Sequence, residues 1–180
     1  MAERSPLARI WIGRASYLAI AVVLMFLHLL PLDTVPRRWA PPDWLLIVTF
    51  AWVARRPDYV PVLLIALVML LSDLLFHRPP GLWTGIVLIC AEGLRRRSAD
   101  LRAVPFPLEW LTIALVICAA VLANRFLLAV SVTPQAPLSL AMVEMVVTIL
   151  AYPIVTWLSY LAFGVTRPAP GAVDALGHRI

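Results

Sequence analysis

The chain has 180 residues, of which 62% are hydrophobic and 14% are charged, and its formal net charge is +5. A soluble domain averages about 45–50% apolar and about 25% charged residues, so this composition excludes an ordinary water-soluble domain and predicts an integral membrane protein. All fifteen basic residues are arginines, and they lie between apolar runs. We therefore interpret the positive charge as a signal of membrane orientation rather than as a nucleic-acid surface.

The first predicted element is an apolar run over residues 15–32, which follows a basic segment. The run is longer than the hydrophobic part of a signal peptide, which has about 7–15 residues, and no small-residue cleavage site follows it. We expect this segment to stay attached as the first membrane span.

Five further apolar segments follow. Residues 60–76, 108–130 and 138–164 are long enough for a spanning helix, which needs roughly 20 apolar residues. Residues 42–56 and 80–95 are shorter and would cover only about 20 Å as helices, so each is either a span or a re-entrant segment. The connections are short and rich in proline, which ends helices.

The distribution of the arginines favours one of these topologies. If all six segments cross with the N-terminus in the cytoplasm, four of the fifteen arginines fall outside, namely Arg37, Arg38, Arg78 and Arg125, and eleven fall inside. We therefore predict an all-α polytopic membrane bundle of six transmembrane helices, two of them short, with both termini cytoplasmic. Residues 1–167 form its single domain, and residues 168–180 form a flexible cytoplasmic tail.

The tryptophans give a second, weaker signal, because six of the seven fall near predicted span ends: Trp11, Trp39, Trp44, Trp52, Trp83 and Trp110. Such positions are typical of rings in the headgroup layer. The alternative is that these rings pack between helices.

Two opposite charges lie within the predicted fifth and sixth spans. Arg125 and Glu144 are at matching depths from the outer side, and a charge in lipid needs a partner. We predict an Arg125–Glu144 ion pair that acts as a structural clamp. The alternatives are that each side chain reaches the outer interface separately, or that the two serve an ion or proton relay.

Three further acidic residues mark predicted helix ends. Asp73 either joins a solvated rim or fixes the turn that contains Arg78. Asp43 follows Pro42, a pattern typical of a helix start, where a carboxylate accepts free backbone N–H groups. Glu109 opens the fifth span, and we interpret it as a helix-end charge facing anionic lipid, with a docking surface for a cytoplasmic partner as the alternative.

The sequence contains no H-E-x-x-H, no G-x-S-x-G, no paired-histidine metal spacing and no phosphate-binding glycine loop. We therefore predict no enzymatic activity, no cofactor and no metal site.

Four short motifs lie within residues 40–100: Pro42 with Asp43 at the start of the second span, Arg56 with Pro57 after it, Leu70 to Asp73 at the end of the third, and Pro80 with Gly81 in the next turn. This pattern resembles MreD, the small membrane subunit of the bacterial rod-shape-determining system. The glycine that usually precedes the aspartate by a few residues is replaced here, within the run VMLLSD.

The resemblance implies a non-catalytic scaffold in the bacterial inner membrane. It would bind MreC and act with the actin-like MreB, RodA and the elongation-specific penicillin-binding transpeptidase in lateral wall synthesis, with membrane lipids around it. Structural or interaction candidates are then Asp43, Arg56, Asp73, Arg78, Gly81, Arg125 and Glu144.

MreD-like proteins also look distantly like the six-helix substrate-binding (S-component-like) subunits of energy-coupling-factor vitamin transporters. This likeness supplies the fold expectation and an alternative function, the capture of a vitamin. An outer cavity filled by leucine and phenylalanine would favour the scaffold, whereas an open, wet cavity would favour transport.

Overall fold

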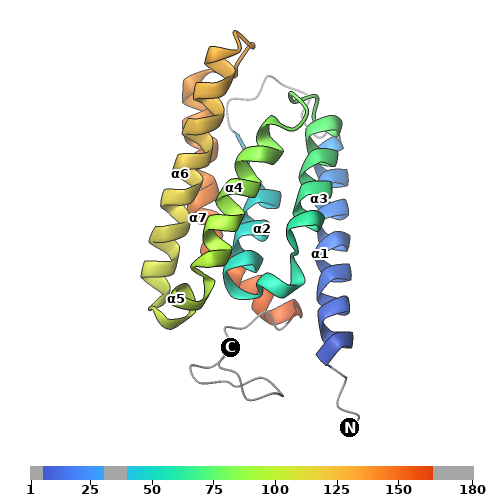
Figure 1. Ribbon diagram of the computed structural model, residues 1–180. Coiled ribbons are helices and arrows are strands. Elements are labelled where there is room, and N and C mark those ends of the chain that lie inside the picture. Colours follow the sequence, from blue (N-terminus) through green and yellow to red (C-terminus); the bar gives the residue numbers. More distant parts are fainter. Residues whose placement is uncertain (1–5, 31–39, 164–180) are drawn as a thin grey trace.

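The computed structural model describes residues 6–30 and 40–163, and all regular structure in these ranges is helical. The elements in chain order are α1 (Pro6–Leu29), α2 (Trp44–Arg55), the short 3-10 helix η1 (Pro57–Tyr59), α3 (Val62–Leu75), α4 (Leu82–Arg96), α5 (Ser98–Ala103), α6 (Phe106–Val130) and α7 (Leu138–Phe163) (Figure 1). The predicted tail, residues 168–180, lies outside the described residues.

The helices α1, α2, α3, α4, α6 and α7 alternate in direction through the bundle (Figure 1). The α3–α4 and α6–α7 connections lie at one end, which we call the upper end, and η1 and α5 lie at the lower end. Of the ten arginines in the described ranges, only Arg78 and Arg125 belong to the upper end. The charge asymmetry expected from the sequence is therefore present between the two ends of the bundle.

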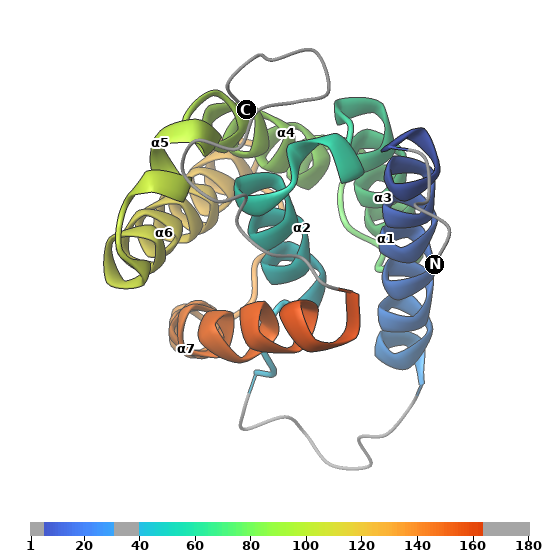
Figure 2. The ribbon, with the colours of Figure 1, turned by 90° about the horizontal axis from the view of Figure 1, so that it is seen from below.

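Helix α2 forms the centre of the molecule. Residues 45–54 are all buried, and α2 packs against α1, α4, α5, η1 and α7 (Figure 2). A helix that is apolar on every side is stable only where every side is covered. The second predicted segment is therefore the core of the bundle.

The helices around α2 carry the exposed apolar surface. Three of them are long and apolar enough to cross a membrane: α1 over Leu7–Leu29, α6 and α7. About a fifth of the most apolar stretch of each is buried, and the rest presents leucine, valine and phenylalanine outward, which is compatible with contact with lipid. α2 and α3 are shorter apolar helices, so six complete spans stay a prediction.

The helix boundaries differ most from the predicted ones at the start of the first span and after the fourth span. α1 begins at Pro6 rather than residue 15, and Gly13 lies against the Tyr59 ring, where a Cβ atom would not fit. α5 was not predicted from the sequence; its buried residues, Ser98 and Leu101, are one turn apart.

Some of the tryptophans fit the interpretation that their rings lie in the headgroup layer, and others pack between helices. Trp11 and Trp44 are exposed near helix ends, but Trp52 and Trp83 are buried. The Trp52 indole donates a hydrogen bond from Nε1 to Ser159 Oγ at 3.1 Å. The headgroup interpretation is therefore wrong for Trp52 and Trp83, which pack between helices.

Candidate functional site

The carboxylate of Asp73 fixes the turn between α3 and α4. Its side chain is fully buried, and Oδ2 accepts hydrogen bonds from Gly81 N at 3.0 Å, Thr84 N at 3.2 Å and Thr84 Oγ1 at 2.8 Å. These donors include amides of the first turn of α4, which lack partners within the helix. The interpretation that Asp73 fixes the turn is confirmed, and the solvated rim is wrong for this residue.

Gly81 allows the backbone to make this turn. Its φ of 83° lies in the left-handed region, and a Cβ atom there would have open space around it. The requirement for glycine is therefore one of backbone conformation rather than of packing.

Arg78 is held by aromatic rings. Its backbone N–H donates to Asp73 O at 2.9 Å, and its guanidinium carbon lies 5.5 Å from the centre of the Phe76 ring and 5.7 Å from that of Trp83. Within residues 6–30 and 40–163, the guanidinium makes no hydrogen bond or ion pair. The turn thus presents a positioned cation.

Asp43 begins α2, as predicted. Its Oδ1 accepts a hydrogen bond from Leu46 N at 3.0 Å, and its own N–H donates to Thr148 Oγ1 on α7, also at 3.0 Å. Asp43 therefore both caps α2 and joins the upper ends of α2 and α7.

The predicted Arg125–Glu144 clamp is wrong as a direct ion pair. Arg125 Nη1 donates to the Ala136 carbonyl at 3.3 Å, and the ion pairs within the described ranges do not include Arg125 with Glu144. Two residues at the same depth on neighbouring helices lie at the same level of the bundle, but their side chains need not point toward each other. Both residues nevertheless line the same cavity.

That cavity, which we call the polar cavity, has a volume of about 530 Å³ at the upper end. Apolar residues such as Leu46 and Ile117 line it together with Asp43, Arg78, Arg125 and Glu144. A second space of about 640 Å³, the apolar cleft, lies between α1, the start of α2 and the start of α7. The two share Asp43, Arg78, Ala136 and Glu144 in their walls.

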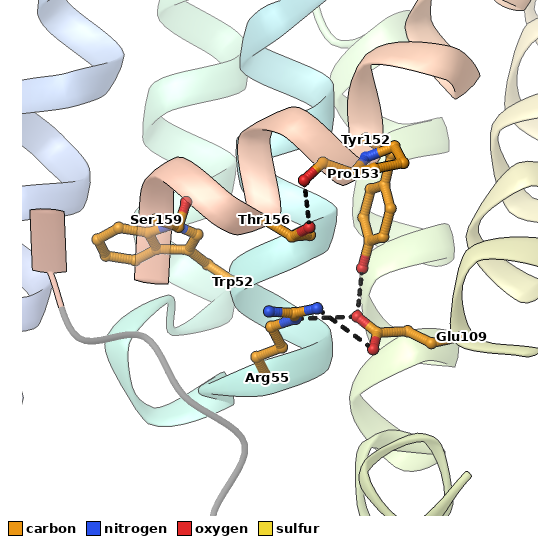
Figure 3. A network of polar contacts seen from close by, with 7 residues as sticks. All are labelled: Trp52, Arg55, Glu109, Tyr152, Pro153, Thr156 and Ser159. Carbon is orange, nitrogen blue, oxygen red and sulfur yellow. Dashed lines mark hydrogen bonds and ion pairs between the residues drawn. The ribbon is translucent and has the colours of Figure 1, made fainter. Parts of the chain in front are cut away.

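A buried charge network lies toward the lower end, and the sequence interpretation missed it (Figure 3). Glu109 is 1% exposed; its Oε1 lies 2.9 Å from Arg55 Nε and accepts a hydrogen bond from the Tyr152 hydroxyl at 2.6 Å. The prediction that Glu109 faces anionic lipid is therefore wrong. A charge among apolar residues that follows two prolines was the available signal, but its partners come from α2 and α7.

Two more arginines contact the segment between α2 and α3, which contains η1. Arg95 donates to the carbonyls of Pro57 at 2.9 Å and Val60 at 2.6 Å, and the guanidinium carbon of Arg56 lies 5.9 Å from the centre of the Tyr59 ring. Arg56, a candidate from the sequence, thus lies at the end of α2 against η1.

Comparisons of this chain with protein-family models, with curated protein sequences and with solved structures gave no match.

Proposed function

We propose that this chain is a non-catalytic scaffold subunit of the machinery that builds the lateral wall of rod-shaped bacteria. In this proposal six helices cross the inner membrane with both termini in the cytoplasm, and the chain binds MreC directly. Through MreC it helps to position MreB, RodA and the elongation penicillin-binding transpeptidase.

The observation that carries the proposal is the environment of Asp73. This aspartate is the acidic residue of the MreD-like motif, and its Oδ2 bonds only groups of the α4 start. A carboxylate surrounded in this way holds a turn in shape and is inaccessible to a substrate. Asp43 and Gly81, also in the MreD-like segment, likewise shape helix starts.

The arginine distribution supports the orientation. The lower end carries Arg55, Arg56, Arg95, Arg96, Arg97 and Arg102, which the positive-inside rule places in the cytoplasm. The upper end then faces the periplasm. There the end of α6, the start of α7 and the connection between them carry an apolar surface suited to the membrane-proximal part of a partner: exposed Phe126, Val130, Val132 and Leu138.

The test is affinity purification of the tagged full-length chain from membranes in mild detergent. We expect MreC to be recovered with the unaltered chain, to be strongly reduced with Asp73→Ala, and to be unchanged with Asp100→Ala, an exposed aspartate on α5. Circular dichroism checks that each variant stays helical. Failure to recover any wall-elongation protein would contradict the proposal, as would equal recovery of MreC with folded Asp73→Ala.

The polar cavity favours a second candidate function, the substrate-capturing subunit of an energy-coupling-factor-type vitamin transporter. Its volume of about 530 Å³ lies within the usual range of small-molecule sites, about 300–1,000 Å³, and charged residues line it. Recovery of a transporter ATPase module in the same purification, without wall-elongation proteins, would favour this candidate.

A further inference from the structure

Helix α7 contains a proline, and a side chain of α6 replaces the hydrogen bond that this proline removes. Pro153 lies inside the helix and has no N–H group, so the carbonyl of Ile149, four residues before it, loses its usual donor within α7. Trp110 Nε1 on α6 donates to this carbonyl at 2.9 Å. An unsatisfied carbonyl is costly in an apolar environment, so this contact stabilises the break in α7.

The residues on both sides of Pro153 take part in further hydrogen bonds (Figure 3). The hydroxyl of Tyr152, which precedes the proline, donates to Glu109, the neighbour of Trp110 in the chain. Thr156 Oγ1 donates back to the carbonyl of Pro153 at 2.8 Å, and bonds of this kind often bend a helix. Two successive residues of α6 therefore bind α7 at the break.

The break divides α7 into two segments that are buried to different degrees. Of the described residues 138–150, which we call the upper segment, only Thr148 is buried. Residues 151–163, the lower segment, bury one side of the helix, and Ser159 accepts the hydrogen bond from the Trp52 indole on α2. The Phe163 ring also lies 5.6 Å from that of Trp52, between centres. Figure 2 shows the lower segment running across the lower end of the bundle toward α1.

The upper segment forms one wall of the polar cavity. Ala141, Met145 and Thr148 line the cavity from α7, and His77 and Pro79 line it from the turn between α3 and α4. A change in the angle between the two segments of α7 would therefore change the width of the cavity.

We propose that Pro153 is a hinge in α7 and that the hydrogen bond between Trp110 and Ile149 is its latch. With the bond in place, the upper segment stays in the position that the structure shows. When the bond opens, the upper segment pivots at Pro153 and the polar cavity widens, while the lower segment stays on α2. This device does not depend on the wall-synthesis role, because it follows from the contacts of α7 with its neighbours alone.

Distances between spin labels, measured by double electron–electron resonance on the full-length chain in lipid nanodiscs, test the hinge. The two native cysteines are first replaced by alanine. Labels at Ser139 and Leu74 then report the upper segment against α3, and labels at Tyr160 and Leu63 report the lower segment against the same helix. All four positions are exposed, so the labels do not disturb the core.

Trp110→Phe removes the indole N–H and keeps an aromatic ring. We expect the ratio of long to short distances in the upper pair to rise about two- to tenfold, which is the effect of one lost hydrogen bond on an equilibrium, and the lower pair to stay unchanged. Trp157→Phe, at an exposed tryptophan of α7, is the matched control and should change neither pair. The proposal is overturned if folded Trp110→Phe leaves the upper pair unaltered, or if both pairs change equally, which would mean that the whole bundle loosens.

Pro153→Ala supplies a second test, because alanine returns an N–H group to the Ile149 carbonyl. In the Pro153→Ala background, Trp110→Phe should therefore no longer shift the distances in the upper pair. If Trp110→Phe alone yields too little folded protein to label, the double variant should restore the yield for the same reason. An effect of Trp110→Phe that is equally large with and without Pro153→Ala overturns the proposal, since the indole would then act elsewhere than at the break.

Discussion

Arg55 on α2 and Glu109 on α6 form an ion pair inside the bundle, with Nε and Oε1 2.9 Å apart and side chains that are 11% and 1% exposed. The Tyr152 hydroxyl on α7 donates to the same Oε1, so one carboxylate oxygen joins three helices (Figure 3). This arrangement fixes the direction in which α6 and α7 pack against the central helix. A carboxylate in these surroundings depends on its partners, because an uncompensated buried charge is costly.

The first prediction concerns this pair. Glu109→Leu should lower the free energy of unfolding by about 3–5 kcal/mol, because it leaves the Arg55 guanidinium without its carboxylate. The double variant Arg55→Met with Glu109→Leu should recover much of the loss. Equilibrium unfolding in mixed micelles measures all three proteins.

The matched control is Glu92→Leu, which removes a partly exposed carboxylate that pairs with Arg96 at i,i+4 and with Arg95 at i,i+3. It should change stability by about 0.5 kcal/mol or less. A double variant that is less stable than Glu109→Leu alone would show that the two residues act independently and would contradict the prediction.

The second prediction isolates the tyrosine. Tyr152→Phe removes the hydroxyl that bonds Glu109 and keeps the ring that stacks on Phe106 at 6.4 Å between centres. A hydrogen bond to a charged group contributes about 1.5–3 kcal/mol, so stability should fall by about that amount. Tyr160→Phe, which alters an exposed ring on the same helix, should have little effect in the same unfolding assay. Equal losses in the two variants would remove the proposed role of the hydroxyl.

Sequence reasoning succeeded where the determinants are local. Asp43 caps a helix through Leu46, three residues away, and Asp73 reaches Gly81, eight residues away. In each case the chain itself brings the partners together, so type and spacing are sufficient.

The predictions that failed share one physical cause: the sequence alone does not determine which way a side chain on a helix points. Glu109 meets Arg55 and Tyr152, which are 54 and 43 residues away, and Arg125 turns to the Ala136 carbonyl rather than to Glu144. Neither orientation is encoded by depth along a helix. The burial of residues 45–54 of α2 could not be predicted either, because apolar residues suit both a protein core and lipid.

The third prediction concerns the cap of α4. Asp73→Ala removes the acceptor of two backbone amides and one hydroxyl, and each buried group left without a partner costs about 1–3 kcal/mol. Asp73→Asn keeps an oxygen acceptor and should therefore be closer to the unaltered protein. Hydrogen exchange at the amides of Gly81 and Thr84 should rise sharply in Asp73→Ala and much less in Asp73→Asn. Unchanged exchange at both amides in Asp73→Ala would contradict the capping role.

The last prediction uses two glycines four residues apart that should respond to the same substitution in opposite directions. Gly81 has a φ of 83°, where a Cβ atom costs about 1–2 kcal/mol, so Gly81→Ala should destabilise the protein although there is space for the methyl group. Gly85 lies inside α4 and likewise has open space around an added Cβ atom. Alanine is the better helix former by about 0.5–1 kcal/mol, so Gly85→Ala should be stabilising. Both variants are compared in the same unfolding experiment. A Gly81→Ala protein as stable as Gly85→Ala would mean that the α3–α4 turn does not require a left-handed residue, and Asp73 would then hold a different turn from the one described.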